Sequence, residues 1–142
     1  MHQRFRELVK QSIIWQIALG LYWLGLFVVT HIPSEMAALP GASTDKLVHV
    51  AAFALLAMLL ATAWELSAGP IWFRHLACAW LLLVLYGAID EWTQTLVGRQ
   101  ASLYDWLGDA IGALIGLAVF VALRGLVVAR LQRADHGERI NQ

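Results

Sequence analysis

Two short stretches that are bordered by long apolar runs contain several ionisable residues each. The first is "TDKLVH" at 44–49 and the second is "IDEWTQTLVGRQASLYDWLGD" at 89–109. Together they hold nine candidate site residues: Asp45, Lys46, His49, Asp90, Glu91, Gln94, Arg99, Asp105 and Asp109. Carboxylates and imidazole can transfer protons or ligate a metal, and the two cations can hold a phosphate.

The spacing of these residues suggests that they converge. His49 follows Asp45 by four positions, and the pairs at 90 and 94 and at 105 and 109 have the same separation. Residues four apart lie on one side of a helix. Three helix ends can therefore direct polar groups into one pocket.

Helix capping explains only two of the five acids. Asp45 and Asp105 each follow a hydroxyl residue at the expected start of a helix, where an acid complements the helix dipole. Asp90 and Glu91 lie near the end of a helix, where the dipole disfavours anions. Asp109 lies about one turn, roughly 5 Å, inside its helix and is too deep to cap it.

The cluster has more negative than positive charge. If all nine residues converge, five carboxylates face Lys46 and Arg99 as the only fixed cations. A proton on one acid, a charged His49, a bound cation or contact with water must offset the excess. Two interpretations stay open: a binding site in which a divalent cation is possible, or a salt-bridge network that joins helices.

Four long apolar runs must position these residues. The chain has 142 residues, of which 60% are hydrophobic and 14% charged, and a spanning helix needs about 20 mostly apolar residues. We predict helices at about 12–31, 46–65, 71–92 and 103–128. None has the polar stripe of a helix on a soluble protein. The expected fold is all-α: a single polytopic membrane domain, 1–142, with four transmembrane helices in a compact bundle.

Three glycines recur every four residues in the last helix: Gly108, Gly112 and Gly116. Such a ridge of small residues lets another helix approach closely. We favour packing within the chain, while a homo-oligomer or a membrane partner remains possible.

Other features narrow the classes of function. The net charge is zero, so nothing indicates nucleic acid as a partner. The single cysteine, Cys78, excludes an internal disulfide and is expected to be a small buried apolar residue. His31 and His75 are isolated from the acids in the sequence and receive no role.

The basic residues predict the orientation of the chain. Of ten lysines and arginines, only Lys46 and Arg99 fall on one side if four helices alternate. Basic residues accumulate on the cytoplasmic side, so both termini should be cytoplasmic and the candidate site should face outward. Trp64 and Trp72 flank the inner link, and Trp92 and Trp106 flank the outer one, as an aromatic belt would place them.

The order of these motifs resembles the VanZ-like family of small bacterial membrane proteins. The matching elements are Asp45-Lys46 with His49, Asp90-Glu91 with Gln94, Gly98-Arg99, Ser102 with Asp105, and the helix with Gly112 and Gly116. The resemblance covers about residues 44–120. Asp109 stands where the family pattern has Asn, so a titratable acid replaces a neutral amide.

The resemblance implies a multi-pass protein of the bacterial inner membrane, linked with the cell envelope and with low-level teicoplanin resistance. Its partners would be the lipid bilayer and a glycopeptide or lipid-linked amphipathic ligand. We favour a non-enzymatic binding protein. The alternatives are a hydrolase or transferase acting on a phosphorylated lipid, and an accessory subunit of a membrane complex; no cofactor is identified.

Overall fold

Four long helices make up the protein in the computed structural model, which describes residues 2–33 and 42–140. They are α1 His2–Thr30, α2 Ala42–Ala68, α3 Phe73–Gln94 and α4 Leu103–Ile140, with a short 3-10 turn, η1 Thr95–Val97, after α3. No strand occurs among these described residues. The all-α prediction is confirmed.

Each helix contains a stretch that is long and apolar enough to cross a membrane. These stretches are Val9–Thr30, Lys46–Ala68, Phe73–Val97 and Leu103–Arg130. Two of the helices extend well beyond the expected ranges: α1 begins at His2 rather than near residue 12, and α4 continues to Ile140 rather than ending near residue 128. The added residues include many Gln, Arg and Glu side chains, which favour a helix but are too polar to lie in lipid.

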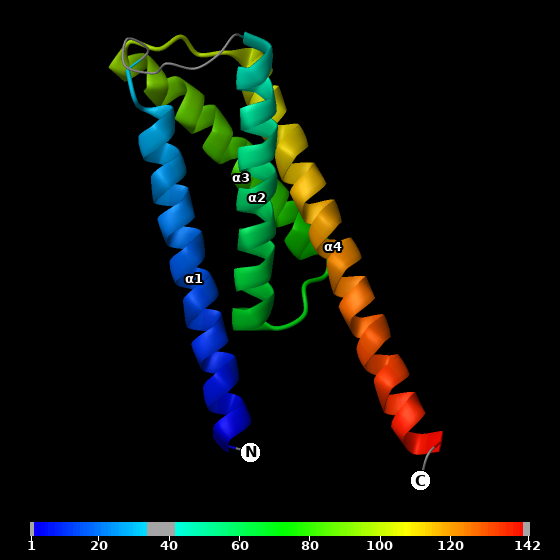
Figure 1. Cartoon of the computed structure of the whole chain (residues 1–142). Helices are drawn as coiled ribbons and strands as arrows, with labels where there is room; N and C mark the ends of the chain where they lie inside the picture. Colours follow the sequence, from blue (N-terminus) through cyan, green and yellow to red (C-terminus); the bar gives the residue numbers. More distant parts are fainter. Residues whose placement is uncertain (1, 34–41, 141–142) are drawn as a thin grey trace.

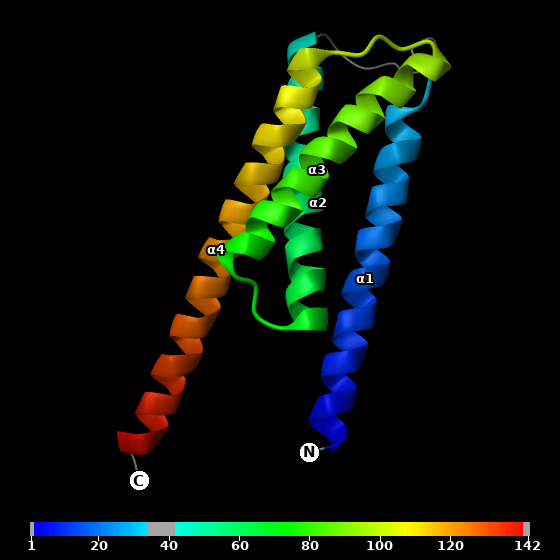
Figure 2. The same cartoon turned by 180° about the vertical axis from the view of Figure 1, so that it is seen from behind.

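Successive helices alternate in direction, so α2 and α4 run parallel to one another (Figure 1). These two make the most extensive contact in the bundle, α1 packs on α2, and α3 crosses obliquely against α4 (Figure 2). The start of α1 and the end of α4 lie at the same end of the molecule. The opposite end, which we call the polar end, holds the end of α1, the start of α2, the end of α3 and the start of α4.

The glycine ridge of α4 lies against α2. A Cβ added to Gly112 would overlap the carbonyl oxygen of Val50, and one added to Gly116 would overlap that of Ala54. At Gly108 a Cβ would lie 3.5 Å from the Cβ of His49, an ordinary contact. The two backbones are thus in contact along this ridge, and α2 holds His49 directly beside the first turns of α4.

Two glycines with positive φ end the helical segments. Gly69 (φ 88°) follows α2, and its N–H donates to the carbonyl of Glu65 over 3.0 Å. Gly98 (φ 78°) ends η1 in the same left-handed conformation. Glycine is the residue that adopts this conformation without steric cost, so both turns are determined locally.

The bundle is narrow and apolar on its outside. Its core contains large side chains such as Phe53, Leu56 and Leu83, interleaved with alanines. Large aliphatic side chains also cover the outer surface; Leu21 is 67% exposed and Leu85 is 63% exposed. Such an exterior matches lipid rather than water. Cys78 lies on this exposed surface, so its expected burial was wrong: it lies on the outer face of α3, away from the core.

Candidate functional site

Five polar side chains are buried at the polar end: His49, Asp90, Glu91, Gln94 and Asp109. They come from α2, α3 and α4, and Asp109 has no exposed surface at all. Buried polar groups are costly unless they are paired, so their partners decide what this region can do. The structure divides them into two clusters.

The first cluster joins one residue from each of three helices. Nδ1 of His49 in α2 lies 2.9 Å from Oδ1 of Asp109 in α4. Glu91 in α3 completes the group, since one ligand atom of each residue lies within 4.8 Å of the other two. The His49–Glu91–Asp109 cluster is therefore compact enough to hold one cation.

Asp109 is only half satisfied in this cluster. Its Oδ1 contacts His49, whereas its buried Oδ2 has no hydrogen-bond partner. Gly87 of α3 lies beside this oxygen, since a Cβ added there would be 3.1 Å from Oδ2. The sequence did not single out Gly87, because its contact with Asp109 depends on how α4, which begins 16 residues later, packs against α3.

Glu91 has a partner on the backbone. Its Oε2 accepts the N–H of Ser102 over 2.7 Å, just before α4 begins. The carboxylate thus lies at the N-terminus of α4, where the dipole favours an anion, although the end of its own helix does not. Ser102 Oγ in turn accepts the N–H of Asp105 over 3.3 Å, a side-chain cap of the first turn.

The second cluster, the Asp90 network, is fully hydrogen-bonded. Asp90 Oδ1 accepts the hydroxyls of Thr30 over 3.2 Å and Tyr86 over 3.3 Å. Its Oδ2 accepts Gln94 Nε2 over 2.8 Å, a contact between residues four apart in α3. These bonds tie the end of α1 to α3, so Asp90 has a structural role that accounts for its burial.

His31, to which the sequence assigned no role, lies beside this network. Its Nε2 is 3.0 Å from Thr93 Oγ1, its Nδ1 is 2.8 Å from the carbonyl oxygen of Phe27, and it approaches Asp90 to 3.9 Å. One feature of the sequence could have indicated this position. His31 stands at the end of the first apolar run, and alternating helices place that end on the same side of the membrane as residues 89–109.

The two cations of the polar end do not pair with the buried acids. Lys46 is exposed, with its Nζ 4.9 Å from the ring centre of Tyr104, and Arg99 reaches the carbonyl oxygen of Ile32 over 3.4 Å. Asp105 is only half-buried. Asp45 lies in the first turn of α2, and its side chain is outside the described residues. Among the described basic side chains, only those of His31 and His49 lie within 4 Å of a carboxylate oxygen at this end.

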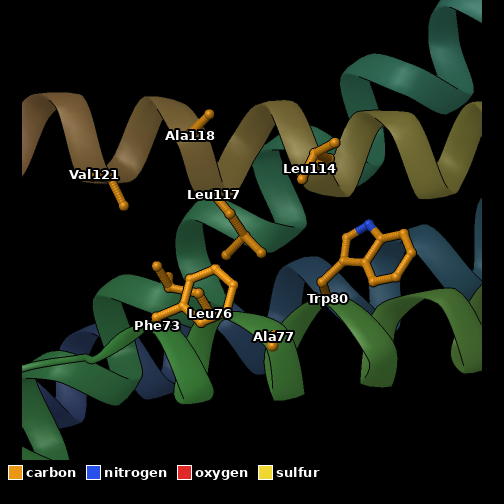
Figure 3. A pocket seen from close by; sticks show the side chains of 8 residues that line it. All are labelled: Phe73, Leu76, Ala77, Trp80, Leu114, Leu117, Ala118 and Val121. Atoms are coloured by element: carbon orange, nitrogen blue, oxygen red, sulfur yellow. The ribbon is translucent and has the colours of Figure 1, made fainter.

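An apolar groove of about 460 Å³ lies between α3 and α4, away from the polar end. Figure 3 shows Phe73, Leu76 and Trp80 of α3 opposite Leu117 of α4. At one end of the groove, Trp80 Nε1 donates to the carbonyl oxygen of Ala110 over 3.0 Å, next to Asp109 in the chain. The groove offers contacts for hydrocarbon and no group that can do chemistry.

Comparison with known proteins identifies the chain by family. No curated protein and no solved structure matches it. The family model described as VanZ/LLP1 matches residues 3–124, which include all four candidate membrane spans up to residue 124 and every residue of both clusters. With that match and four helices suited to a membrane, the chain is a membrane protein that belongs to the VanZ/LLP1 family.

Proposed function

We propose that this protein is a non-enzymatic component of the bacterial inner membrane that binds the anionic headgroup of an amphipathic envelope ligand. Its polar end faces outward and its termini face the cytoplasm. The ligand is a lipid-linked precursor of the envelope or a glycopeptide antibiotic. By the family resemblance, we extend the proposal to low-level resistance to teicoplanin.

The observation that carries this proposal is the free positive charge at the polar end. The buried acids leave Lys46 and Arg99 without an acidic partner among the described side chains. Arginine forms paired hydrogen bonds with phosphate and carboxylate groups. Two cations near the membrane surface therefore suit an anionic headgroup.

The apolar groove between α3 and α4 supports an amphipathic ligand rather than a water-soluble one. It is bounded by side chains such as Phe73, Leu76 and Leu117. One of its ends is formed by Trp80, which donates a hydrogen bond to the carbonyl oxygen of Ala110, the residue that follows Asp109 of the first cluster. A hydrocarbon tail is the matching occupant of such a surface.

Calorimetric titration of the purified protein in detergent tests the proposal. The probes are a polyprenyl phosphate, the corresponding polyprenol without phosphate, and teicoplanin. We expect the phosphate or the antibiotic to bind and the polyprenol to bind at least tenfold more weakly. Arg99→Ala should weaken binding about tenfold or more, because a hydrogen bond to a charged group contributes about 1.5–3 kcal/mol.

Arg130→Ala is the matched control, since Arg130 is an exposed arginine at the far end of α4. It should bind as the wild type does. No heat with any probe, or equal weakening by both substitutions, would contradict a headgroup site at the polar end.

A second candidate, an enzyme acting on a phosphorylated lipid, is favoured by one contact. The 2.9 Å hydrogen bond between His49 and Asp109 is the geometry of a general base oriented by a carboxylate. Release of inorganic phosphate from a polyprenyl phosphate or diphosphate by wild type, and its loss in His49→Gln, would establish this function. Binding without turnover would leave the binding protein as the better account.

A further inference from the structure

We propose that His49, Glu91 and Asp109 bind one divalent transition-metal cation of the Zn²⁺ or Mn²⁺ class. The site does not depend on the headgroup proposal, because it is argued from the buried cluster alone. One ligand comes from each of α2, α3 and α4, so the cation would link these three helices.

The enclosure of the cluster is the first argument. His49 is 8% exposed, Glu91 is 6% exposed and Asp109 is fully buried, and their ligand atoms lie within 4.8 Å of one another. Ligands bind Zn²⁺ at about 2.0–2.2 Å, so adjacent ligand atoms in a tetrahedral site lie roughly 3.3–3.6 Å apart. His49 Nδ1 and Asp109 Oδ1 are 2.9 Å apart, so a further separation of a few tenths of an ångström would bring them to this spacing.

The unpartnered oxygen of Asp109 is the second, independent argument. Oδ2 is buried and lacks any hydrogen bond. An unsatisfied buried polar atom is rare in proteins, and an ion or a water molecule is the kind of partner that would satisfy it. Gly87 of α3 lies beside this oxygen, since a Cβ added there would be only 3.1 Å away, and glycine has no side chain that could act as its partner.

Charge balance is the third argument. Two carboxylates and one imidazole share the cluster, while Lys46 contacts Tyr104 and Arg99 contacts a backbone carbonyl. A pair of buried carboxylates without a cation is costly in a membrane bundle. A divalent cation would neutralise both acids, and it would give Oδ2 a partner if Asp109 binds through this oxygen or through both.

The donor set selects the class of metal. Imidazole nitrogen favours zinc, iron, nickel and copper, and carboxylates extend the choice to manganese, whereas calcium and magnesium prefer oxygen ligands alone. Three protein ligands leave at least one coordination position open. That position is available to water or to an anionic group of a ligand.

Metal analysis of the purified protein tests the inference. We expect about one Zn²⁺ or Mn²⁺ per chain after reconstitution, a higher Tm with either ion than with Mg²⁺ or Ca²⁺, and loss of the increase with a chelator. Asp109→Asn and Glu91→Gln should each raise the Kd for the metal by more than about tenfold. Substitution of residues that only contact the metal ligands already weakens metal binding by about 10–100-fold, and loss of a ligand should cost at least as much.

Asp105→Asn is the matched control, because Asp105 lies one turn away on the same helix and is outside the cluster. It should bind the metal as the wild type does. The Co²⁺ absorption spectrum gives a second readout, which His49→Gln should alter if imidazole is a ligand.

The proposal is overturned if the folded wild type binds no more metal than Asp109→Asn does. It is also overturned if the substitutions at Glu91, Asp105 and Asp109 all change the metal affinity equally. A more stable Asp109→Asn without metal binding in either protein would also overturn it, because the carboxyl would then be a neutral hydrogen-bonding group. Failure here leaves the titration with a polyprenyl phosphate free to succeed, so the two proposals can be separated.

Discussion

At the scale of residues, the buried acids differ by whether the chain itself satisfies them. Asp90 accepts three hydrogen bonds from Thr30, Tyr86 and Gln94, whereas Asp109 has one oxygen without a partner. The two residues are equally buried. The first therefore stabilises the fold, and the second is the better candidate for binding.

Replacing Asp90 with Asn should destabilise the protein. Both carboxylate oxygens of Asp90 accept hydrogen bonds, so the NH₂ group of the asparagine would face another donor in place of an acceptor. An unsatisfied buried polar group costs about 1–3 kcal/mol. Unfolding in detergent, followed by tryptophan fluorescence, measures the change. Asp105→Asn is the control and should lose no more than about 1 kcal/mol, since its acid contributes mainly through the helix dipole. Equal losses in the two variants would remove the special role of the Asp90 network.

At the scale of helices, the contact between α2 and α4 places His49 against Asp109. The ridge of Gly112 and Gly116 lets the carbonyls of Val50 and Ala54 lie directly on α4. Trp106 Nε1 also donates to the carbonyl oxygen of Val84 over 3.0 Å, which ties α4 to α3 near the first cluster. Backbone contact is thus a condition for the site.

Gly116→Ala should lower the free energy of unfolding by about 1–3 kcal/mol, because the added methyl overlaps a backbone carbonyl and the helices must separate. Thermal unfolding in detergent checks this expectation. Gly25→Ala is the control in α1, where a Cβ meets nothing within 4 Å. Its stability should be unchanged or higher by up to about 1 kcal/mol, as helix propensity predicts. A harmless Gly116→Ala would show that the two helices are not held at this distance.

At the scale of the whole molecule, the alternation of helices separates the basic ends of the chain from the polar end. α1 and α4 extend at one end, and that end carries most of the lysines and arginines (Figure 1). The bias of basic residues toward the cytoplasm then predicts the orientation.

Cysteine labelling in spheroplasts measures this orientation. In a Cys78→Ala background, Gln100→Cys near the polar end should react with a membrane-impermeant maleimide, and Gln132→Cys on α4 should react only after lysis. Both positions are exposed, so access is limited by the membrane alone. The reverse pattern would place the polar end in the cytoplasm and contradict the proposed outward site.

Much of the fold was predictable because it depends on local sequence. Apolar runs of sufficient length predict membrane helices, and the structure contains four helices suited to that role. Helix ends were less predictable, since α1 and α4 continue through polar residues that favour a helix equally well. The four-residue spacing of Asp90 and Gln94 did indicate a shared face, where the two side chains form a hydrogen bond.

The sequence by itself determined the four helices, the apolar exterior and the gathering of polar residues at one end, because each follows from composition and periodicity along the chain. Only the tertiary structure decided which polar groups are partners. His49 and Asp109 are 60 residues apart, as are Thr30 and Asp90, and the two pairs belong to separate clusters. Such pairings depend on how closely the helices pack and in which rotation. No local pattern carries that information, and so the unpartnered oxygen of Asp109 appears only when the helices are assembled.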